Sequence, residues 1–177
     1  AVLERGDFPS LVRPHLEALS GRYGVTAIGV ALPDLDHMVV VALARAQTPV
    51  RLHVDVGSRF PALISATGRC LAAFTDRPWS EIKSRFRKLS WHKAPNLAAW
   101  RREVDQARRQ GFSIDRGNYI AGITIVAVPV LDAEGTISHT LAAVGLGNQL
   151  DRATSLRLAR DMKRAAAEVA AETLASS

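Results

Sequence analysis

The stretch from Val50 to Phe74, VRLHVDVGSRFPALISATGRCLAAF, decides how the fold of this chain is interpreted. Residues 50–56 alternate between apolar and polar types, which is the pattern of a β-strand with one buried face. Gly57 ends that run, and Pro61 cannot continue it as a central strand because proline lacks an N–H donor. From Ser65 the spacing becomes helical, with Ser65 as the expected N-cap. The stretch therefore predicts a strand, a turn and a helix in succession.

The start of this helix is a candidate site for an anion. The first N–H groups of a helix have no partners inside it, and the helix dipole adds partial positive charge there. Ala66, Thr67 and Gly68 are small enough to let a carboxylate or phosphate approach the backbone. The ordinary alternative is a capped helix that packs on a sheet and binds nothing. Both interpretations stay open at this level.

The remaining patterns predict an α+β fold, with one antiparallel sheet of about five to six strands and helices packed against it. Short links between successive strands favour antiparallel pairing. If the first and last helices share one face of the sheet, their outer sides can also pair with another copy. Helices are expected to begin at Ser10, Pro78, Asn96 and Arg152, and strands are expected over residues 25–32, 37–45, 112–115, 122–131 and 136–146.

Length and charge set limits on the class of protein. A chain of 177 residues is most simply one domain. Its formal net charge of +6 raises the question whether the protein binds nucleic acid. The basic residues, however, lie on predicted helices and alternate with acidic ones, which favours solvated helix faces over an anion-binding tract. No strand shows the aromatic and basic surface that stacks bases.

The sequence also predicts a cytoplasmic location without membrane contact. The longest apolar run, near Gly122–Leu131, is too short to span a bilayer and is interrupted by Pro129. The first residues lack the apolar segment of a signal peptide. The single cysteine, Cys70, cannot form an internal disulfide, which suits a reducing compartment. Cys70 is expected to be a buried structural residue.

Three segments resemble the effector-binding domain of the IclR family of bacterial transcription regulators. Residues 57–74, GSRFPALISATGRCLAAF, are similar to the family's signature loop and helix. Residues 122–135, GITIVAVPVLDAEG, are similar to its C-terminal strand and turn, and residues 11–19, LVRPHLEAL, to its opening helix. The resemblance implies that residues 1–177 form a single GAF-like domain that senses a small, often carboxylate-bearing metabolite.

The resemblance also implies partners. A winged helix-turn-helix precedes this domain in the family, and no such pattern occurs before Ser10. Operator DNA is therefore expected to be bound only through a separate N-terminal domain. A homodimer or homotetramer is expected as the assembly. No cofactor is expected.

Nine residues form the candidate ligand site. The family's ligand positions fall here on residues that are mostly apolar, and Ser65 and Gly68 are added from the helix start. An apolar pocket with few polar anchors suits an organic acid with an aromatic or aliphatic body. The alternative is a pocket filled by the protein's own side chains. The nine residues are Leu63, Ser65, Ala66, Thr67, Gly68, Asp115, Ile125, Ala142 and Val144.

Two other functions stay open. One is a small enzyme acting on a carboxylate metabolite, with His53 or Asp115 as a base; the other is an oligomerisation module without a ligand. Catalysis is not expected, because no nucleophile motif occurs in the sequence. No two histidines have the helical spacing of metal ligands, so no metal site is expected either.

Overall fold

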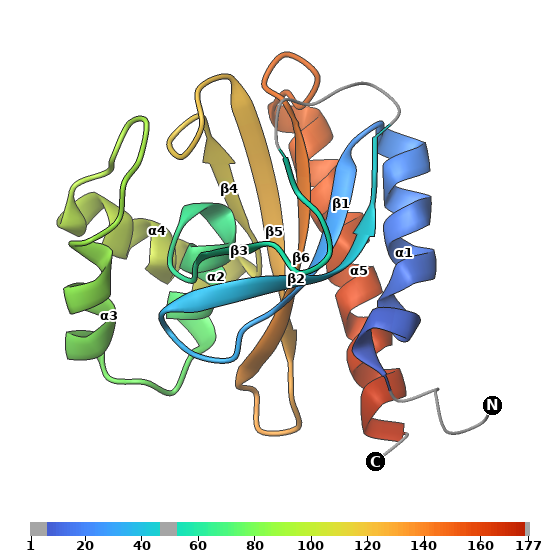
Figure 1. Ribbon diagram of the computed structural model, residues 1–177, viewed down its shortest axis with the longest axis horizontal. Coiled ribbons are helices and arrows are strands. Elements are labelled where there is room, and N and C mark those ends of the chain that lie inside the picture. Colours follow the sequence, from blue (N-terminus) through green and yellow to red (C-terminus); the bar gives the residue numbers. More distant parts are fainter. Residues whose placement is uncertain (1–6, 47–52, 176–177) are drawn as a thin grey trace.

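A computed structural model describes residues 7–46 and 53–175. Within them, six strands form one antiparallel sheet in the order β3-β2-β1-β6-β5-β4, with helices on both faces (Figure 1). The predicted α+β fold is confirmed. The elements are α1 (Phe8–Tyr23), β1 (Thr26–Ala31), β2 (His37–Ala44), β3 (Arg59–Pro61), α2 (Ser65–Phe74), α3 (Trp79–Phe86), α4 (Leu97–Gln110), β4 (Ser113–Arg116), β5 (Ile123–Leu131), β6 (Ile137–Leu146) and α5 (Arg152–Ala175).

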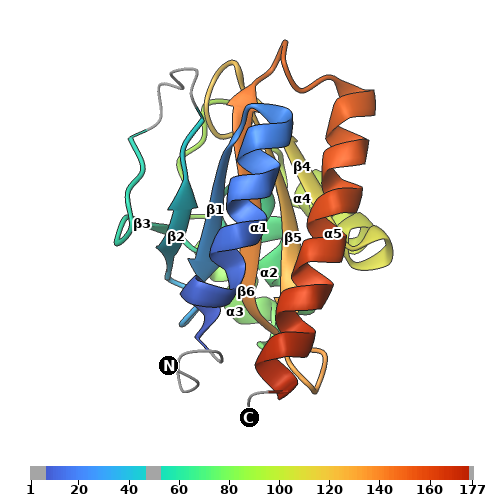
Figure 2. The same cartoon turned by 90° about the vertical axis from the view of Figure 1, so that its right-hand side faces the viewer.

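The first and last helices cover one face of the sheet, where α1 and α5 lie side by side (Figure 2). Helix α1 begins two residues earlier than predicted because Asp7 caps it, accepting a hydrogen bond from the N–H of Ser10 at 3.1 Å. Gly24 ends the helix with a left-handed φ of 67°. The apolar sides of both helices pack on Ala27, Leu141 and other residues of the central strands.

The opposite face carries α2 against the sheet, with α4 behind it and α3 at the far end (Figure 1). Asn96 caps α4 through the N–H of Ala99 at 2.8 Å, and Gly111 ends it, both as predicted. Trp100 is fully buried, with its ring 4.5 Å from that of Phe86. This aromatic contact holds α3 on α4.

The predicted strand at residues 50–56 is wrong where the structure describes it. Residues 50–52 lie outside the described ranges, and residues 53–56 run through a loop and a turn closed by the hydrogen bond from Ser58 N–H to Asp55 O at 2.9 Å. The alternating pattern does not mark a buried face here, because Val54 is buried whereas Val56, equally apolar, is 61% exposed. The short strand β3 follows instead and pairs with β2 at the sheet edge, where Pro61 is tolerated.

Candidate functional site

Helix α2 begins in an unusual way. Ile64 is its N-cap, so the prediction that Ser65 caps the helix is wrong. Ser65 is instead the first helical residue, with a left-handed φ of 61°. The first hydrogen bond of the helix runs from the N–H of Gly68 to the carbonyl of Ile64 at 2.9 Å, and no side chain caps the end. The N–H groups of residues 65–67 come before that bond and therefore have no acceptor within the helix.

Gly68 fixes the path of the chain that enters α2. A Cβ placed on Gly68 would lie 2.0 Å from both the carbonyl carbon and the oxygen of Leu63. No side chain fits between these two segments, so only glycine allows the preceding turn to pack on the helix. The small size of Gly68 therefore serves the protein's own backbone rather than the approach of a ligand.

A small cavity lies beside the start of α2, under the sheet. Its volume is about 40 Å³, which is the space of about one water molecule in the liquid. Apart from three hydroxyl-bearing side chains, its walls are apolar. The lining residues are Ile28, Met38, Val54, Phe60, Ile64, Ser65, Thr67, Tyr119, Ile125, Ala142 and Val144.

The cavity brings together five of the nine candidate residues. Strands β5 and β6 contribute Ile125, Ala142 and Val144 from neighbouring positions, since Ile125 pairs directly with Val144. Helix α2 contributes Ser65 and Thr67. The other four candidates are Leu63, Ala66, Gly68 and Asp115; all four are buried, and none is among the lining residues.

Ser65 carries two energetic costs at the cavity wall. Its side chain is 3% exposed, and its Oγ has no hydrogen-bond partner among the described residues. An unsatisfied buried hydroxyl costs about 1–3 kcal/mol. A left-handed φ in a residue other than glycine costs on the order of 1 kcal/mol more. Strain of this kind persists where the surrounding structure imposes it, and here the close packing of Leu63 on Gly68 does so.

Asp115 is held by the protein itself. It is 1% exposed, and its Oδ1 accepts hydrogen bonds from the N–H groups of Asn118 at 2.8 Å and Tyr119 at 3.3 Å. Its Oδ2 lies 3.5 Å from Nη1 of Arg69, which is also 1% exposed. Asp115 thus shapes the turn that presents Tyr119 to the cavity.

Sequence reasoning missed Arg69 and Tyr119. Arg69 lies on α2 and donates from Nε to Glu103 of α4 at 2.6 Å, so it joins α2, α4 and the end of β4. Tyr119 lines the cavity, and burial raises the pKa of its phenol. A signal for Arg69 existed, since it is the only charged residue in the small and apolar run from Ser65 to Phe74.

The cavity wall is also bonded to the connection between α3 and α4. The N–H of His92 donates to the carbonyl of Tyr119 at 3.1 Å, and the N–H of Lys93 donates to that of Asn118 at 2.8 Å. The side-chain amide of Asn118 returns a bond to the carbonyl of Lys93 at 3.1 Å. A movement of Tyr119 would therefore be transmitted to residues 92–93 through these hydrogen bonds.

Neither the cysteine nor the described His, Asp and Glu side chains show an arrangement suited to thiol or metal chemistry. Burial raises the pKa of the Cys70 thiol to about 12, so the thiol stays neutral. His53 is exposed and does not line the cavity. Across residues 7–46 and 53–175, no three His, Cys, Asp or Glu side chains come together as metal ligands would. Over the same ranges, no helix is both long and apolar enough to cross a bilayer.

An antiparallel sheet with two helices on one face, a buried signature helix on the other and a cavity at that helix's start defines a GAF-like α+β regulatory domain. Comparison with known sequences makes the assignment specific. Residues 1–171 match the family described as Bacterial transcriptional regulator IclR C-terminal. The chain belongs to this family, and the resemblance seen in the sequence is confirmed.

Individual relatives are transcription regulators. The chain is 24% identical over 168 residues to the DNA-binding transcriptional repressor YiaJ of Escherichia coli, covering 92% of this chain and 59% of YiaJ. It is 25% identical over 155 residues to the repressor AllR of Klebsiella pneumoniae, covering 85% and 56%. It is 26% identical over 161 residues to the p-hydroxybenzoate hydroxylase transcriptional activator of Acinetobacter baylyi, covering 85% and 57%. The chain thus spans less than three fifths of each of these relatives.

Solved structures share the fold. The IclR crystal structure from Thermotoga maritima superposes with a TM-score of 0.83 at 20% identity, covering 97% of this chain and 70% of that one. A regulator of the same family from Alicyclobacillus acidocaldarius gives 0.82 at 24% identity, covering 94% and 68%. At these identities the likeness concerns the fold.

Proposed function

We propose that this chain is the effector-binding and oligomerisation domain of an IclR-type regulator, and that its effector is a carboxylate with an aromatic or aliphatic body. One observation carries the proposal. The buried Oγ of Ser65 has no partner among the described residues and lies beside the open N–H groups of α2, at an apolar cavity. A carboxylate would satisfy these donors together.

The chemistry of the cavity supports this class of effector. The N–H groups of residues 65–67 and the positive end of the helix dipole attract an anion. Ile125, Ala142 and Val144 offer only apolar contact to the rest of the ligand. A small hydrophilic acid gains little from such walls. The activator from Acinetobacter baylyi is named for the hydroxylase of p-hydroxybenzoate, and p-hydroxybenzoate is an aromatic carboxylate.

Binding requires the cavity to enlarge, because 40 Å³ is far below the roughly 300 Å³ of a typical ligand pocket. Phe60 is the wall residue that we expect to move. It lies on β3, which pairs with the sheet through only three residue pairs with β2. In this proposal the effector binds the conformation in which Phe60 has moved outward and stabilises it over the closed one.

The proposal also concerns the longer protein. The chain forms a homodimer or homotetramer, and a separate N-terminal domain recognises operator DNA. The protein acts in the cytoplasm and has no turnover of its own. The membership of the IclR family and the transcription regulators among its relatives support this assignment. An enzymatic role for Asp115 has no support, because three donors already engage its carboxylate.

Thermal shift and calorimetric titration of the chain against a panel of acids test the proposal. Benzoate, p-hydroxybenzoate or octanoate is expected to raise the melting temperature, since a ligand that binds only the folded state stabilises it. Stronger binding of glyoxylate or pyruvate would overturn the preference for an apolar body.

A variant with a filled cavity tests whether the acid binds there. Ala142→Val adds two methyl groups at the cavity wall and should abolish the ligand-dependent shift. The matched control is Ala153→Val on the exposed surface of α5, which should keep it. An unchanged shift in Ala142→Val would show that the acid binds elsewhere.

A further inference from the structure

The positive charge of this protein is concentrated at one end. Residues 77–109, which contain α3 and α4, hold ten lysines and arginines against three acidic residues, a net charge of +7. Because the whole chain has a net charge of +6, the remaining residues sum to −1. The sequence alone distributes basic residues over several helices, but the fold places α3 and the start of α4 together at the end away from α1 and α5 (Figure 1). The last turn of α4 approaches α5, where Nζ of Lys163 donates to the carbonyl of Gln110 at 2.8 Å.

Most of these charges have no acidic partner. Ion pairs engage Arg77 with Glu81, Arg85 with Asp36, and Arg108 with Asp105. For the other seven, no carboxylate of the described residues lies within ion-pair distance. These seven define the basic end: Lys83, Arg87, Lys88, Lys93, Arg101, Arg102 and Arg109.

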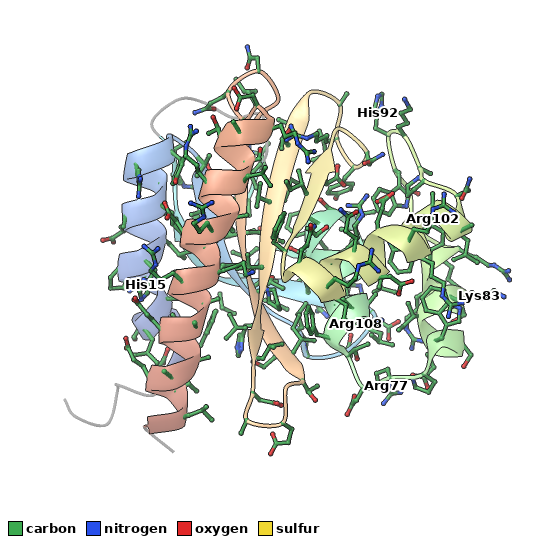
Figure 3. All side chains as sticks on the ribbon, turned by 180° about the vertical axis from the view of Figure 1, so that it is seen from behind. His15, Arg77, Lys83, His92, Arg102 and Arg108 are labelled. Carbon is green, nitrogen blue, oxygen red and sulfur yellow. The ribbon has the colours of Figure 1, made fainter. Side chains whose placement is uncertain are left out.

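The basic end points away from the sheet. Seen from behind, Lys83 on α3 and Arg102 on α4 project outward at this end, whereas His15 lies on α1 at the other (Figure 3). The guanidinium of Arg101 lies 4.4 Å from the ring centre of Trp79, so this cation is held at the surface by its aromatic neighbour. The two helices and their connection thus carry all seven unpaired cations, and six of them are exposed.

The dimensions and the charge point to an extended polyanion. Helix α4 has 14 residues and is about 21 Å long, which corresponds to about six base pairs of duplex DNA. A single small anion would engage only a fraction of such a surface. A second copy of this chain has a net charge of only −1 outside residues 77–109, which falls far short of neutralising +7.

We propose that the basic end contacts the phosphate backbone of duplex DNA, independently of base sequence. The family acts in transcription, so DNA is the polyanion that such a protein meets. Phosphate contacts contribute affinity and orientation but carry no direct sequence information. The surface would thus add to the operator recognition assigned to a separate domain. This inference does not depend on effector binding.

Fluorescence anisotropy tests the inference with the 177-residue chain, a labelled 30-base-pair duplex of arbitrary sequence and no effector. The test variant replaces Arg87, Lys88, Arg102 and Arg109 with Gln. The control replaces four exposed arginines of α1 and the start of α5 with Gln, which removes the same charge away from the basic end. The control residues are Arg13, Arg22, Arg152 and Arg157.

The wild-type chain and the control should bind the duplex with an affinity that falls steeply with salt. The test variant should bind at least about tenfold more weakly at 50 mM NaCl, and its salt slope should decrease by about 3 to 4, because each lost phosphate contact removes about 0.9. Equal melting temperatures would show that all three proteins are folded.

Three results would overturn the inference. One is the absence of duplex binding by the wild-type chain at 50 mM NaCl. Another is an equal loss in the control, which would assign the attraction to bulk charge. The third is tighter binding of a single-stranded RNA of the same length, which would assign the surface to RNA. None of these results bears on effector binding, which the acid panel tests separately.

Discussion

Replacing Gly68 with alanine should destabilise the protein although it favours the helix. In an exposed helix, Gly→Ala gains about 1 kcal/mol. Here the new Cβ would lie 2.0 Å from the carbonyl carbon and the oxygen of Leu63 and 2.5 Å from its Cα. These are backbone atoms, which cannot rotate away as a side chain would, so either Leu63 or α2 has to shift.

The magnitude follows from these contacts. Overpacking a core by a methyl group costs about 1–3 kcal/mol, and contacts this short with rigid atoms belong at the upper end. After the gain in helix propensity is subtracted, Gly68→Ala should lose about 2 kcal/mol of unfolding free energy. This is a large share of a typical total of about 5–15 kcal/mol.

Urea unfolding followed by circular dichroism measures this loss. With a slope of about 2 kcal/mol/M, the midpoint should fall by about 1 M. The control is Gly21→Ala on α1, where nothing lies within 4 Å of the added Cβ. It should raise the unfolding free energy by about 0.5–1 kcal/mol. A Gly68→Ala protein as stable as the wild type would refute the close approach of Leu63 to α2.

Three further perturbations test separate features. Ser65→Gly should raise the unfolding free energy by about 1 kcal/mol, because it relieves the left-handed φ and removes an unpartnered hydroxyl; a lower melting temperature would contradict this. Arg69→Met should cost about 3 kcal/mol in urea unfolding, since it leaves Asp115 buried without its counter-charge, whereas Arg77→Met at an exposed pair should change less than about 1 kcal/mol. Burial lowers the pKa of His139 to about 4, so on acidification the unfolded chain takes up this proton near pH 6.5, before the folded chain does. The unfolding free energy should therefore fall by up to about 3 kcal/mol between pH 6.5 and pH 4. His139→Gln should flatten this pH dependence, and an unchanged dependence would assign it to other groups.

The sequence determined most elements because their signals are local. Asn96 and Gly111 bracket α4 since a capping amide and a left-handed glycine act on the nearest turn of the helix. The hairpin of β5 and β6 follows from two long apolar strands joined by a short turn that ends at Gly135. The local alternation at residues 53–56 misled because it predicts neither pairing nor burial: the segment is a loop and turn, and Val56 is exposed.

Only the tertiary structure decided what surrounds the start of α2. Asp115 and Arg69 are 46 positions apart, and their contact depends on how β4 packs beside α2. The volume of the cavity depends on Phe60 and Tyr119. Phe60 lies on β3 and Tyr119 follows β4, and these are the two edge strands of the sheet. The net charge follows from the composition. Which cations stay unpaired depends on ion pairs between residues far apart in the sequence, such as Arg85 with Asp36. Such contacts join residues far apart in the chain, so no local pattern encodes them.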